Sequence, residues 1–421
     1  METALTSPGR NEDNLTVADM ESWVDGPPHA TFAELRAKCP VHWSPGVTGI
    51  PHEPGFWSIT RAEDIATISR DWKTFSSNLD GAVDFSWEGM PEHLKELAKT
   101  DMINLDPPRH DRLKALFLAG FTSERIAAEE SKVLQAVRHV LDRLDGKDTC
   151  DLVTDVSKPI VARVIHGFMG IPEEDDPRWI HNISRYIAVD DPDFNPGGLE
   201  EWLEVFIPDL IGQCVELVEQ RKANPGNDLI SILVNAEVEG DRLTEEEIVA
   251  GMLLLFAAGN DSTMATFVSA MKALIENPGE RQKVLDDLSL VPSTVEEALR
   301  MFPAFTMMRR TATRDVEFGG QPIKAGDKVI LWYPSANRDE SRYTDPDRFD
   351  VTRNPEHQAF GAGGRHFCLG NALARLELRL MIEETLRRYP QMEIIGDAPF
   401  TESFFVNQRK SLPVRLGPRA S

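Results

Sequence analysis

Apolar residues recur at helical spacing along most of the chain and predict a mainly helical protein. The pattern is nearly continuous from about residue 123 to 240, with breaks at 170–172, 190–198 and 224–227. The second break joins two predicted helices, so we expect a loop there that opens and closes over a pocket. A shorter helix is predicted from Arg61 to Arg70.

The longest predicted helix begins at Thr244, where Thr-Glu-Glu-Glu has the form of a capping box. It ends near Glu276, because Asn277-Pro278 follows. Between residues 252 and 258 it is apolar on nearly every side, which predicts that it is buried through the molecule. This apolar run is much shorter than the ~20 residues that cross a bilayer, so the sequence predicts no membrane span.

Strands are predicted at 56–60, 316–318 and 328–332, where apolar and β-branched residues lie between turn signals. Residues 76–103 carry glycine, proline and exposed aromatic residues, which predicts a long loop of the kind that often has a function.

The fold class expected from these patterns is a single α-rich domain with a small β lobe. Residues 1–20 are polar and predicted to be disordered. Residues 21–421 are predicted to form one domain, because no low-complexity linker, repeat or block of charge divides them.

Net charge, the N-terminal sequence and the cysteine count limit the kinds of partner and the cellular compartment that we expect for this protein. With 69 acidic and 45 basic residues the net charge is −24, which argues against nucleic acid and anionic membranes as partners. The N-terminus lacks the basic and then apolar pattern of a signal peptide. Four scattered cysteines suit a reducing compartment better than a disulfide framework, so we expect a cytoplasmic protein.

The candidate chemistry centres on Cys368. Glycines precede and follow it, which allows a tight turn with the backbone close to a flat or bulky group. A helical pattern begins at Leu369, so the Cys368 sulfur is expected at a helix N-terminus that favours the thiolate. With His366 two residues before it, this arrangement fits a haem iron bound by cysteine.

Two other interpretations of Cys368 stay open at this point. One is a buried structural cysteine beside a glycine turn. The other is a zinc site with His366 and His357, although these residues do not form the paired ligand motifs of structural zinc sites.

Two further clusters each have a structural and a functional interpretation. His110 and Lys114 share one face of a helix that opens at Asp-Pro-Pro, and they are either solvated charges or a grip on an anionic group. The stretch 258–263 places Gly, Asp, Ser and Thr inside the apolar helix. It is either a polar patch satisfied by its neighbours or a proton relay in a bent helix.

The cysteine segment resembles the haem-binding loop of the cytochrome P450 family, Phe-x-x-Gly-x-[basic]-x-Cys-x-Gly. Gly364, His366 and Gly370 match this pattern, whereas its Phe position holds Gly361 and Phe360 lies one residue further out. A similar extension occurs in some bacterial members, several of which act on sterols or methyl-branched lipids.

The resemblance extends over nearly the whole chain and assigns further residues. Asp261 takes the acid position of the oxygen-activation motif Ala-Gly-x-[Asp/Glu]-Thr-Thr, and Ser262 replaces its first Thr. His110 and Lys114 match a propionate-binding motif in which Arg is usual at the second position. Arg310 falls where the family has another propionate-binding arginine.

Glu297 and Arg300 match the family's Glu-x-x-Arg motif, which is weak by itself and gains weight from its position in the chain. The resemblance implies a third member of this structural group, for which we choose Arg353, with Arg348 in reserve.

The residues implied for the site are of three kinds. The catalytic group is Asp261, Ser262 and Thr263. The cofactor contacts are His110, Lys114, Ala258, Gly259, Arg310, Phe360, Gly361, His366, Cys368 as the metal ligand, and Gly370. Substrate contacts are expected from Thr306, Met308 and the regions 76–103 and 190–198.

The resemblance implies a monooxygenase that holds haem b between the long helix and the Cys368 loop. Such an enzyme inserts one oxygen atom from O2 into a C–H bond of an apolar substrate, here a terpenoid, steroid or branched lipid. Its electrons are expected from a separate ferredoxin and ferredoxin reductase, and we expect a monomer.

Three other functions compete with this one. The first two are a haem-thiolate ligand carrier or sensor and a peroxide-driven oxygenase. Asp261 and Ser262 argue against both, because neither function needs a relay of protons. A cysteine hydrolase is more distant, since no His-Asn couple accompanies Cys368.

Overall fold

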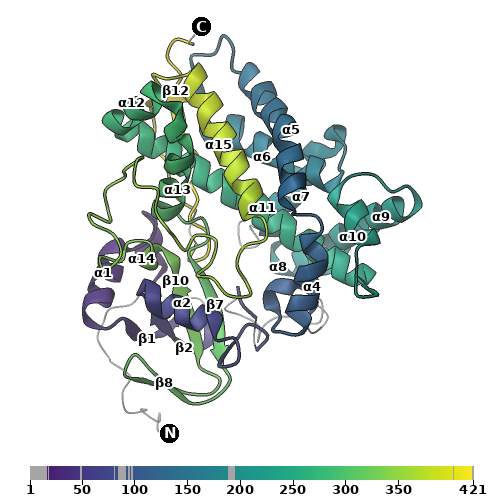
Figure 1. Ribbon diagram of the computed structural model, residues 1–421, viewed down its shortest axis with the longest axis vertical. Helices are drawn as coiled ribbons and strands as arrows, with labels where there is room; N and C mark the ends of the chain where they lie inside the picture. The colour runs from purple at the N-terminus through teal and green to yellow at the C-terminus, as the bar shows by residue number, and fades with distance from the viewer. Residues whose placement is uncertain are drawn as a thin grey trace.

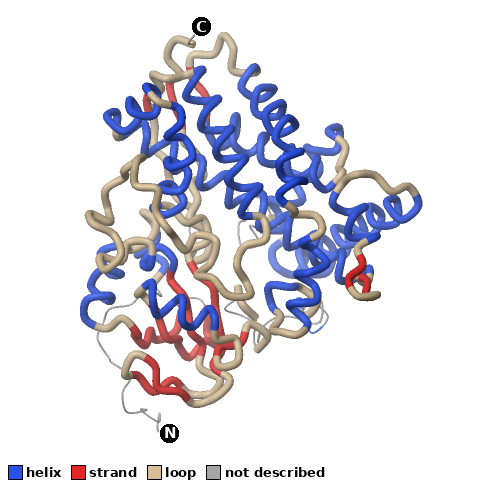
Figure 2. The backbone as a smooth tube through the Cα atoms, viewed as in Figure 1, coloured by secondary structure: helices blue, strands red, loops and turns tan. Residues whose placement is uncertain are grey.

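The computed structural model describes residues 17, 19–47, 50–79, 81–83, 92, 95, 98–187, 195–401 and 403–419. Helices make up most of the molecule, and most of the strands lie at one end of it, near the N-terminus, whereas a smaller group of strands lies near the C-terminus at the opposite end (Figures 1 and 2). This is the predicted arrangement of an α-rich body with a small β lobe.

The helices have the following bounds: η1 Met20–Trp23, α1 His29–Lys38, α2 Ala62–Arg70, η3 Met102–Asn104, α4 Arg109–Leu118, α5 Ser123–Asp142, η4 Leu152–Ser157, α6 Lys158–Met169, η5 Glu173–Asp175, α7 Asp176–Ile187, α8 Gly198–Glu201, η6 Trp202–Phe206, α9 Ile207–Ala223, α10 Leu229–Asn235, α11 Glu245–Glu276, α12 Pro278–Asp286, η7 Leu288–Leu290, α13 Val291–Met301, α14 Tyr333–Ala336 and α15 Asn371–Arg388.

The central helix of the body is α11, which packs against α6, α9, α13 and α15 (Figure 1). It begins and ends where the sequence predicted, and the Thr244 side chain and Glu247 form the capping box. By length and composition α11 passes the test for a membrane-crossing helix, but 56% of its apolar window is buried inside the molecule. We therefore interpret it as the core helix of the body.

The strands have the following bounds: β1 Val41–Val47, β2 Ile50–Ile59, β3 Phe75–Ser76, β4 Thr149–Asp151, β5 Glu237–Val238, β6 Asp241–Arg242, β7 Met307–Ala312, β8 Val316–Phe318, β9 Gln321–Ile323, β10 Lys328–Trp332, β11 Glu393–Ile394 and β12 Pro413–Arg415.

The main sheet has the strand order β1-β2-β10-β7-β3. The pair β2 and β10 is parallel, with Ile330 opposite Ser58, and the other neighbours in this sheet are antiparallel. The sequence predicted β8, β10 and the second half of β2. It missed β1 and β7, whose polar residues Ser44, Arg309 and Arg310 are buried by tertiary contacts.

Several predicted irregular segments lie wholly or partly outside the described residues. These are 1–16 and 18, most of the 80–97 stretch, and 188–194. Within the segment that the sequence predicts to be disordered, Val17 is fully buried and its carbonyl accepts a hydrogen bond from the Trp23 indole at 2.9 Å.

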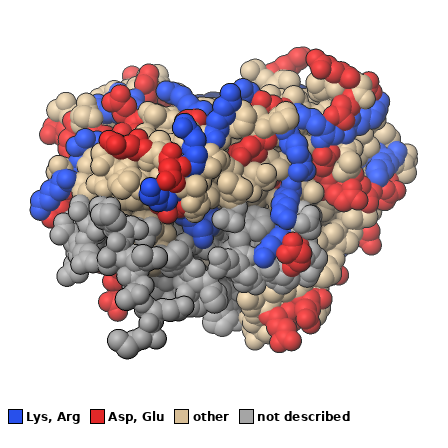
Figure 3. Space-filling view, turned by 90° about the horizontal axis from the view of Figure 1, so that it is seen from below, with Lys and Arg blue, Asp and Glu red and all other residues tan. Residues whose placement is uncertain are grey.

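On the described part of the face shown in Figure 3, Lys and Arg lie beside Asp and Glu. Surface ion pairs among the described residues include Arg242 with Glu237 and Arg415 with Glu393.

Candidate active site

A cavity of about 370 Å³ lies where the β lobe meets the helical body. Its walls come from α4, α6, α7, α11, β7 and the loop that carries Cys368. Most of the lining is apolar, as in sites for small organic ligands. All the sequence-predicted cofactor residues line it, and so do Ser262, Thr263 and Met308.

The Cys368 loop is a tight turn that favours glycine at three positions. Gly361, Gly363 and Gly364 have φ angles of 92°, 84° and 82°, and a Cβ on Gly364 would lie 2.6 Å from the Ser69 carbonyl oxygen. The Cys368 amide closes the turn by donating to the Phe360 carbonyl at 3.0 Å. The extra residue between Phe360 and the cysteine is therefore accommodated inside the turn.

Helix α15 begins at Asn371, two residues later than the sequence predicted, and Gly370 is its N-cap. A Cβ on Gly370 would meet no protein atom within 4 Å, so this side of the loop is open to the cavity. Burial raises the pKa of the Cys368 thiol, although the amides of Gly370 and Asn371 and the charge of Lys114 act in the opposite direction. An iron bound at Cys368 would act in the same direction as Lys114 and favour the predicted thiolate.

Four cationic or ionisable nitrogen groups line one part of the cavity: His110, Lys114, Arg310 and His366. The two histidine rings lie with their centroids 4.2 Å apart. Lys114 donates to the carbonyls of Arg365 and Phe367, the latter at 2.9 Å. Lys114 and His110 are therefore not solvated charges, in contrast to Arg112, which pairs at the surface with Asp241 and Glu247.

Arg310 is a buried cation without a carboxylate partner among the described residues. Its guanidinium is buried and donates to the Arg309 carbonyl at 2.6 Å, and the described residues give it no carboxylate within ion-pair distance. Burial lowers the pKa of Arg310 and holds that of His366 well below its ordinary value. A buried cation without an anion is costly, so this cradle fits a ligand with carboxylate groups, such as the two propionates of haem.

Helix α11 forms another wall of the cavity, and two of its small residues, Gly259 and Ser262, serve different purposes. A Cβ on Gly259 would lie 2.7 Å from the Ile165 Cδ1 atom, so glycine lets α6 approach α11 closely. The Ser262 hydroxyl donates to the Ala258 carbonyl at 2.6 Å and faces the cavity with its oxygen still able to accept.

Asp261 does not line the main cavity. It lines a second cavity of about 20 Å³ with Lys158, Ser184 and Asn260, between α6, α7 and α11. Burial raises the pKa of Asp261 to about 6, and Lys158 acts in the opposite direction. The space is enough for about one water molecule with polar neighbours on several sides.

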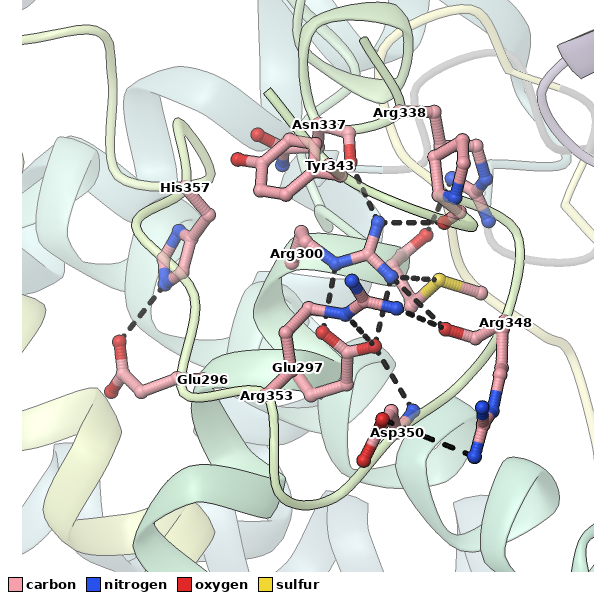
Figure 4. Close-up of polar contacts among 12 residues, drawn as sticks. Glu296, Glu297, Arg300, Asn337, Arg338, Tyr343, Arg348, Asp350, Arg353 and His357 are labelled. Atoms are coloured by element: carbon pink, nitrogen blue, oxygen red, sulfur yellow. Dashed lines mark hydrogen bonds and ion pairs between the residues drawn. The ribbon is translucent and has the colours of Figure 1, made fainter. Parts of the chain in front are cut away.

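Glu297, Arg300 and Arg353 form one buried network (Figure 4). Arg300 donates to both carboxylate oxygens of Glu297 at 2.8 Å, and Arg353 donates to one of them at 3.1 Å. Arg300 also holds the carbonyls of Asn337 and Pro346, at 2.8 and 2.7 Å. The reserve choice, Arg348, is 59% exposed and lies 3.7 Å from Glu280 instead.

The prediction for Thr306 is wrong. Its side chain is fully buried away from the cavity and donates to the Phe404 carbonyl, because Thr306 bridges β7 to the C-terminal segment. Its neighbours Ala304 and Phe305 line the cavity in its place. Of the other expected substrate regions, 76–103 contributes Val83 and the stretch 101–103, and the described part of 190–198 does not reach the cavity.

Sequence reasoning did not name four titratable residues of the cavity: Asp101, Tyr186, Tyr333 and Glu377. Of these, Asp101 falls inside the predicted region 76–103. Glu377 lies on α15 and is almost fully buried, and burial raises its pKa well above the ordinary value. A carboxylate on the apolar face between Leu373 and Leu380 was the available signal.

The zinc interpretation loses its third ligand. His357 binds Glu296 at 3.1 Å and accepts from the Ala359 amide, so it does not lie with Cys368 and His366. Within the described ranges, no group of three or more His, Cys, Asp or Glu residues is placed to hold a metal ion.

Comparisons with known proteins agree with this geometry. The family model for cytochrome P450 matches residues 79–401. The methyl-branched lipid omega-hydroxylase of Mycobacterium tuberculosis is 34% identical over 95% of this chain and 94% of its own length. Linalool 8-monooxygenase of Pseudomonas putida is 31% identical over 93% and 96%. A Mycobacterium marinum cytochrome P450 in complex with pseudoionone superposes with a TM-score of 0.88, at 35% identity, over 97% of this chain and 100% of that one.

Proposed function

Because this chain belongs to the cytochrome P450 family of haem-thiolate monooxygenases, we propose that it inserts one oxygen atom from O2 into a C–H bond of an apolar terpenoid, steroid or branched lipid. The observation that carries the proposal is the pairing of Cys368 with an apolar cavity of about 370 Å³. The named substrates of the relatives, a methyl-branched lipid and linalool, support the substrate class.

We infer haem b as the cofactor, with Cys368 as the ligand of its iron. The cradle of His110, Lys114, Arg310 and His366 would hold the propionates. Lys114 gives a charge without the two-pronged geometry of arginine. When bound, the haem iron supplies the activation of O2.

The protein's own groups would handle water and protons. The apolar lining would exclude bulk water from the substrate. The Ser262 oxygen, at the cavity wall, would accept a hydrogen bond from one water molecule, which serves as the proton donor. Asp261, on the far side of α11, would collect protons through the small cavity that it shares with Lys158 and Ser184. Because Asp261 and Ser262 are adjacent in α11 and line different cavities, they suit a relay that passes a proton from the small cavity to the main one.

Electrons would come from a separate ferredoxin and its reductase. The surface beside Cys368 supports this, since Phe367 is 38% exposed there and Arg365 is exposed at the same loop. The proposal extends to a monomer in the cytoplasm, and the four free cysteines favour that compartment.

The first test replaces Cys368 with Ser. The reduced carbon monoxide complex of the wild type should show the red-shifted Soret band of thiolate ligation, and Cys368→Ser should lose it. Cys214→Ser is the matched control, because Cys214 is buried in the hydrophobic core and should leave the band intact. A wild type that shows the band of histidine-ligated haem, or binds no haem, contradicts the proposal.

A second test separates an oxygenase from a carrier or a peroxide-driven enzyme. Ser262→Ala should keep NADH consumption through the electron carriers and divert it to hydrogen peroxide, because the hydroxyl that holds the donor is gone. Ser262→Thr should raise the fraction of NADH that ends in product, since the β-methyl restricts the hydroxyl. Unchanged ratios of product and peroxide to NADH in both variants would favour the rival functions.

A further inference from the structure

Asp101 and Tyr186 are two polar residues of the cavity that the proposed function leaves without a role. Other polar lining groups belong to the cationic cradle, to the hydroxyls of α11, or to pairs such as Ser69 with the Gly363 carbonyl. Glu377, on α15, also has no role in the proposed function, and one of its carboxylate oxygens has no partner among the described residues. Asp101 precedes η3 and Tyr186 lies on α7, two segments that carry none of these groups.

Asp101 uses one of its carboxylate oxygens to cap η3. Its Oδ1 atom accepts from the Ile103 amide at 3.0 Å. In the described part of the chain its Oδ2 atom has no hydrogen-bond partner, and Asp101 lines the main cavity. Capping of η3 therefore accounts for one oxygen of this carboxyl group and leaves the other oxygen without a partner among the described residues.

The Tyr186 hydroxyl is in the same situation. The Tyr186 ring stacks on Trp202 with an interplanar angle of 10° and a centroid distance of 6.1 Å, which fixes the ring. No hydrogen bond to its hydroxyl is formed by the described residues, and Tyr186 lines the same cavity. Burial raises the pKa of Tyr186, and the Asp101 charge acts in the same direction. What places the two groups together is the cavity that both of them line.

We propose that the substrate is an alcohol, and that Asp101 and Tyr186 bind its hydroxyl group and so determine specificity. This inference rests on the proposed monooxygenase function. A hydroxyl group donates to the carboxylate and at the same time accepts from the tyrosine O–H, so it satisfies both groups. A hydrocarbon or an ether of the same shape leaves the Asp101 oxygen unpaired in an apolar cavity.

Other polar groups fit less well. Burial raises the pKa of Asp101 to about 7, so a substantial fraction is ionised at neutral pH and repels a carboxylic acid. An ammonium group pairs with the carboxylate, but it is costly to bring into an apolar cavity and cannot accept from Tyr186.

The experiment measures binding to the haem-loaded protein by the ligand-induced absorption shift and by calorimetry. The probes are two matched pairs, farnesol with its methyl ether and a free 3-hydroxy sterol with its 3-methyl ether, together with the amine and the acid that correspond to farnesol. For at least one skeleton the wild type should bind the alcohol about tenfold or more tightly than the ether, the effect expected of a hydrogen bond to a charged group.

Two variants locate the effect. Asp101→Ser keeps an oxygen that can cap η3 and removes the oxygen that faces the ligand, and Tyr186→Phe removes only a hydroxyl. Each should reduce the preference for the alcohol by about threefold or more while leaving the affinity for the ether within about threefold. Asp287→Ser is the control, since Asp287 caps the short helix η7 in the same way outside the cavity.

Equal affinity for alcohol and ether in the wild type overturns the inference, as does tighter binding of the amine or the acid. A preference that survives in both variants, or no binding of either alcohol, also overturns it. Failure of the proposed function is distinct, because it appears as the absence of the thiolate band before any ligand is added.

Discussion

Asp261 and Ser262 follow each other in the sequence but serve two cavities. Ser262 lines the main cavity, whereas Asp261 lines the small cavity with Lys158. Successive residues of a helix point about 100° apart, so one step along α11 moves from one wall of the helix to another. The Asp261 carboxylate has a proposed role in proton transfer, and its burial costs stability.

The first prediction at the residue scale uses that cost. Asp261→Asn should slow turnover by about 10² or more, while haem content and substrate affinity stay nearly unchanged. The same variant should be more stable than the wild type at neutral pH. The folded pKa of about 6 exceeds the ordinary 3.8, so the ionised side chain destabilises the fold by about 3 kcal/mol at most.

The sign of this effect fixes its pH window. The penalty is absent below pH 3.8, grows as the pH rises, and is complete above about pH 6. Melting temperatures of the two haem-loaded proteins should therefore diverge from about pH 4 to about pH 7. An Asp261→Asn protein that turns over like the wild type refutes the relay, and one that gains no stability at neutral pH refutes the buried carboxylate.

At the scale of elements, α13 connects the helical body with the loop region that leads to Cys368. Glu297 on α13 accepts from Arg300, Arg353 and the Asp350 amide, and so draws the segment after α14 against the helix. Both charges of the central pair are fully buried. Such a pair is weak evidence for net stability, but removing one partner leaves the other as an uncompensated buried charge.

Glu297→Ala should therefore lose about 3 to 5 kcal/mol and yield haem-poor or insoluble protein. Haem content per protein and the urea midpoint measure this. Arg348→Ala is the matched control on the same segment, since Arg348 is mostly exposed and should change stability by less than about 1 kcal/mol. Fully loaded, stable Glu297→Ala protein would mean that the network does not support the loop.

At the scale of the whole molecule, the site exists only because the β lobe closes on the helical body. Arg310 and Met308 come from β7, and the other walls come from helices far away in the sequence. The N-terminal helix α1 is tied to the lobe by the ion pair of Arg36 with Glu340, at 2.7 Å. The first residue of α1, His29, lies close to Arg36 and Arg338.

The burial of His29 at this contact predicts that the folded protein loses stability at acid pH. Burial, Arg338 and Arg36 hold the pKa of His29 well below its ordinary 6.5. As the pH falls below about 6.5 the unfolded chain takes up a proton that the folded protein does not, so stability decreases. From about pH 7.5 to about pH 5.5 the melting temperature of the wild type should fall more than that of His29→Gln.

His181→Gln is the control for this comparison, because His181 is an exposed residue of α7. It should follow the wild type over the same pH range. Identical pH curves for the wild type and His29→Gln would show that His29 is not held neutral in the fold.

The sequence by itself determined the features that depend on local order and spacing. The glycine turn before Cys368, the capped helix α11 and the pairing of Glu297 with Arg300 all follow from residues close together in the chain. Side chains three or four apart on a helix meet whatever the rest of the fold does, and a positive φ demands glycine in any context.

Only the tertiary structure decided how distant segments share these features. It turned Thr306 away from the cavity, brought Arg353 rather than Arg348 to Glu297, and placed Asp101 and Tyr186 on the walls of one cavity. It also raised the pKa of Cys368, where the helix start alone favours the thiolate. The physical reason is that burial and charge at a point depend on all the chain that packs around it, and periodicity carries no record of which distant residues those are.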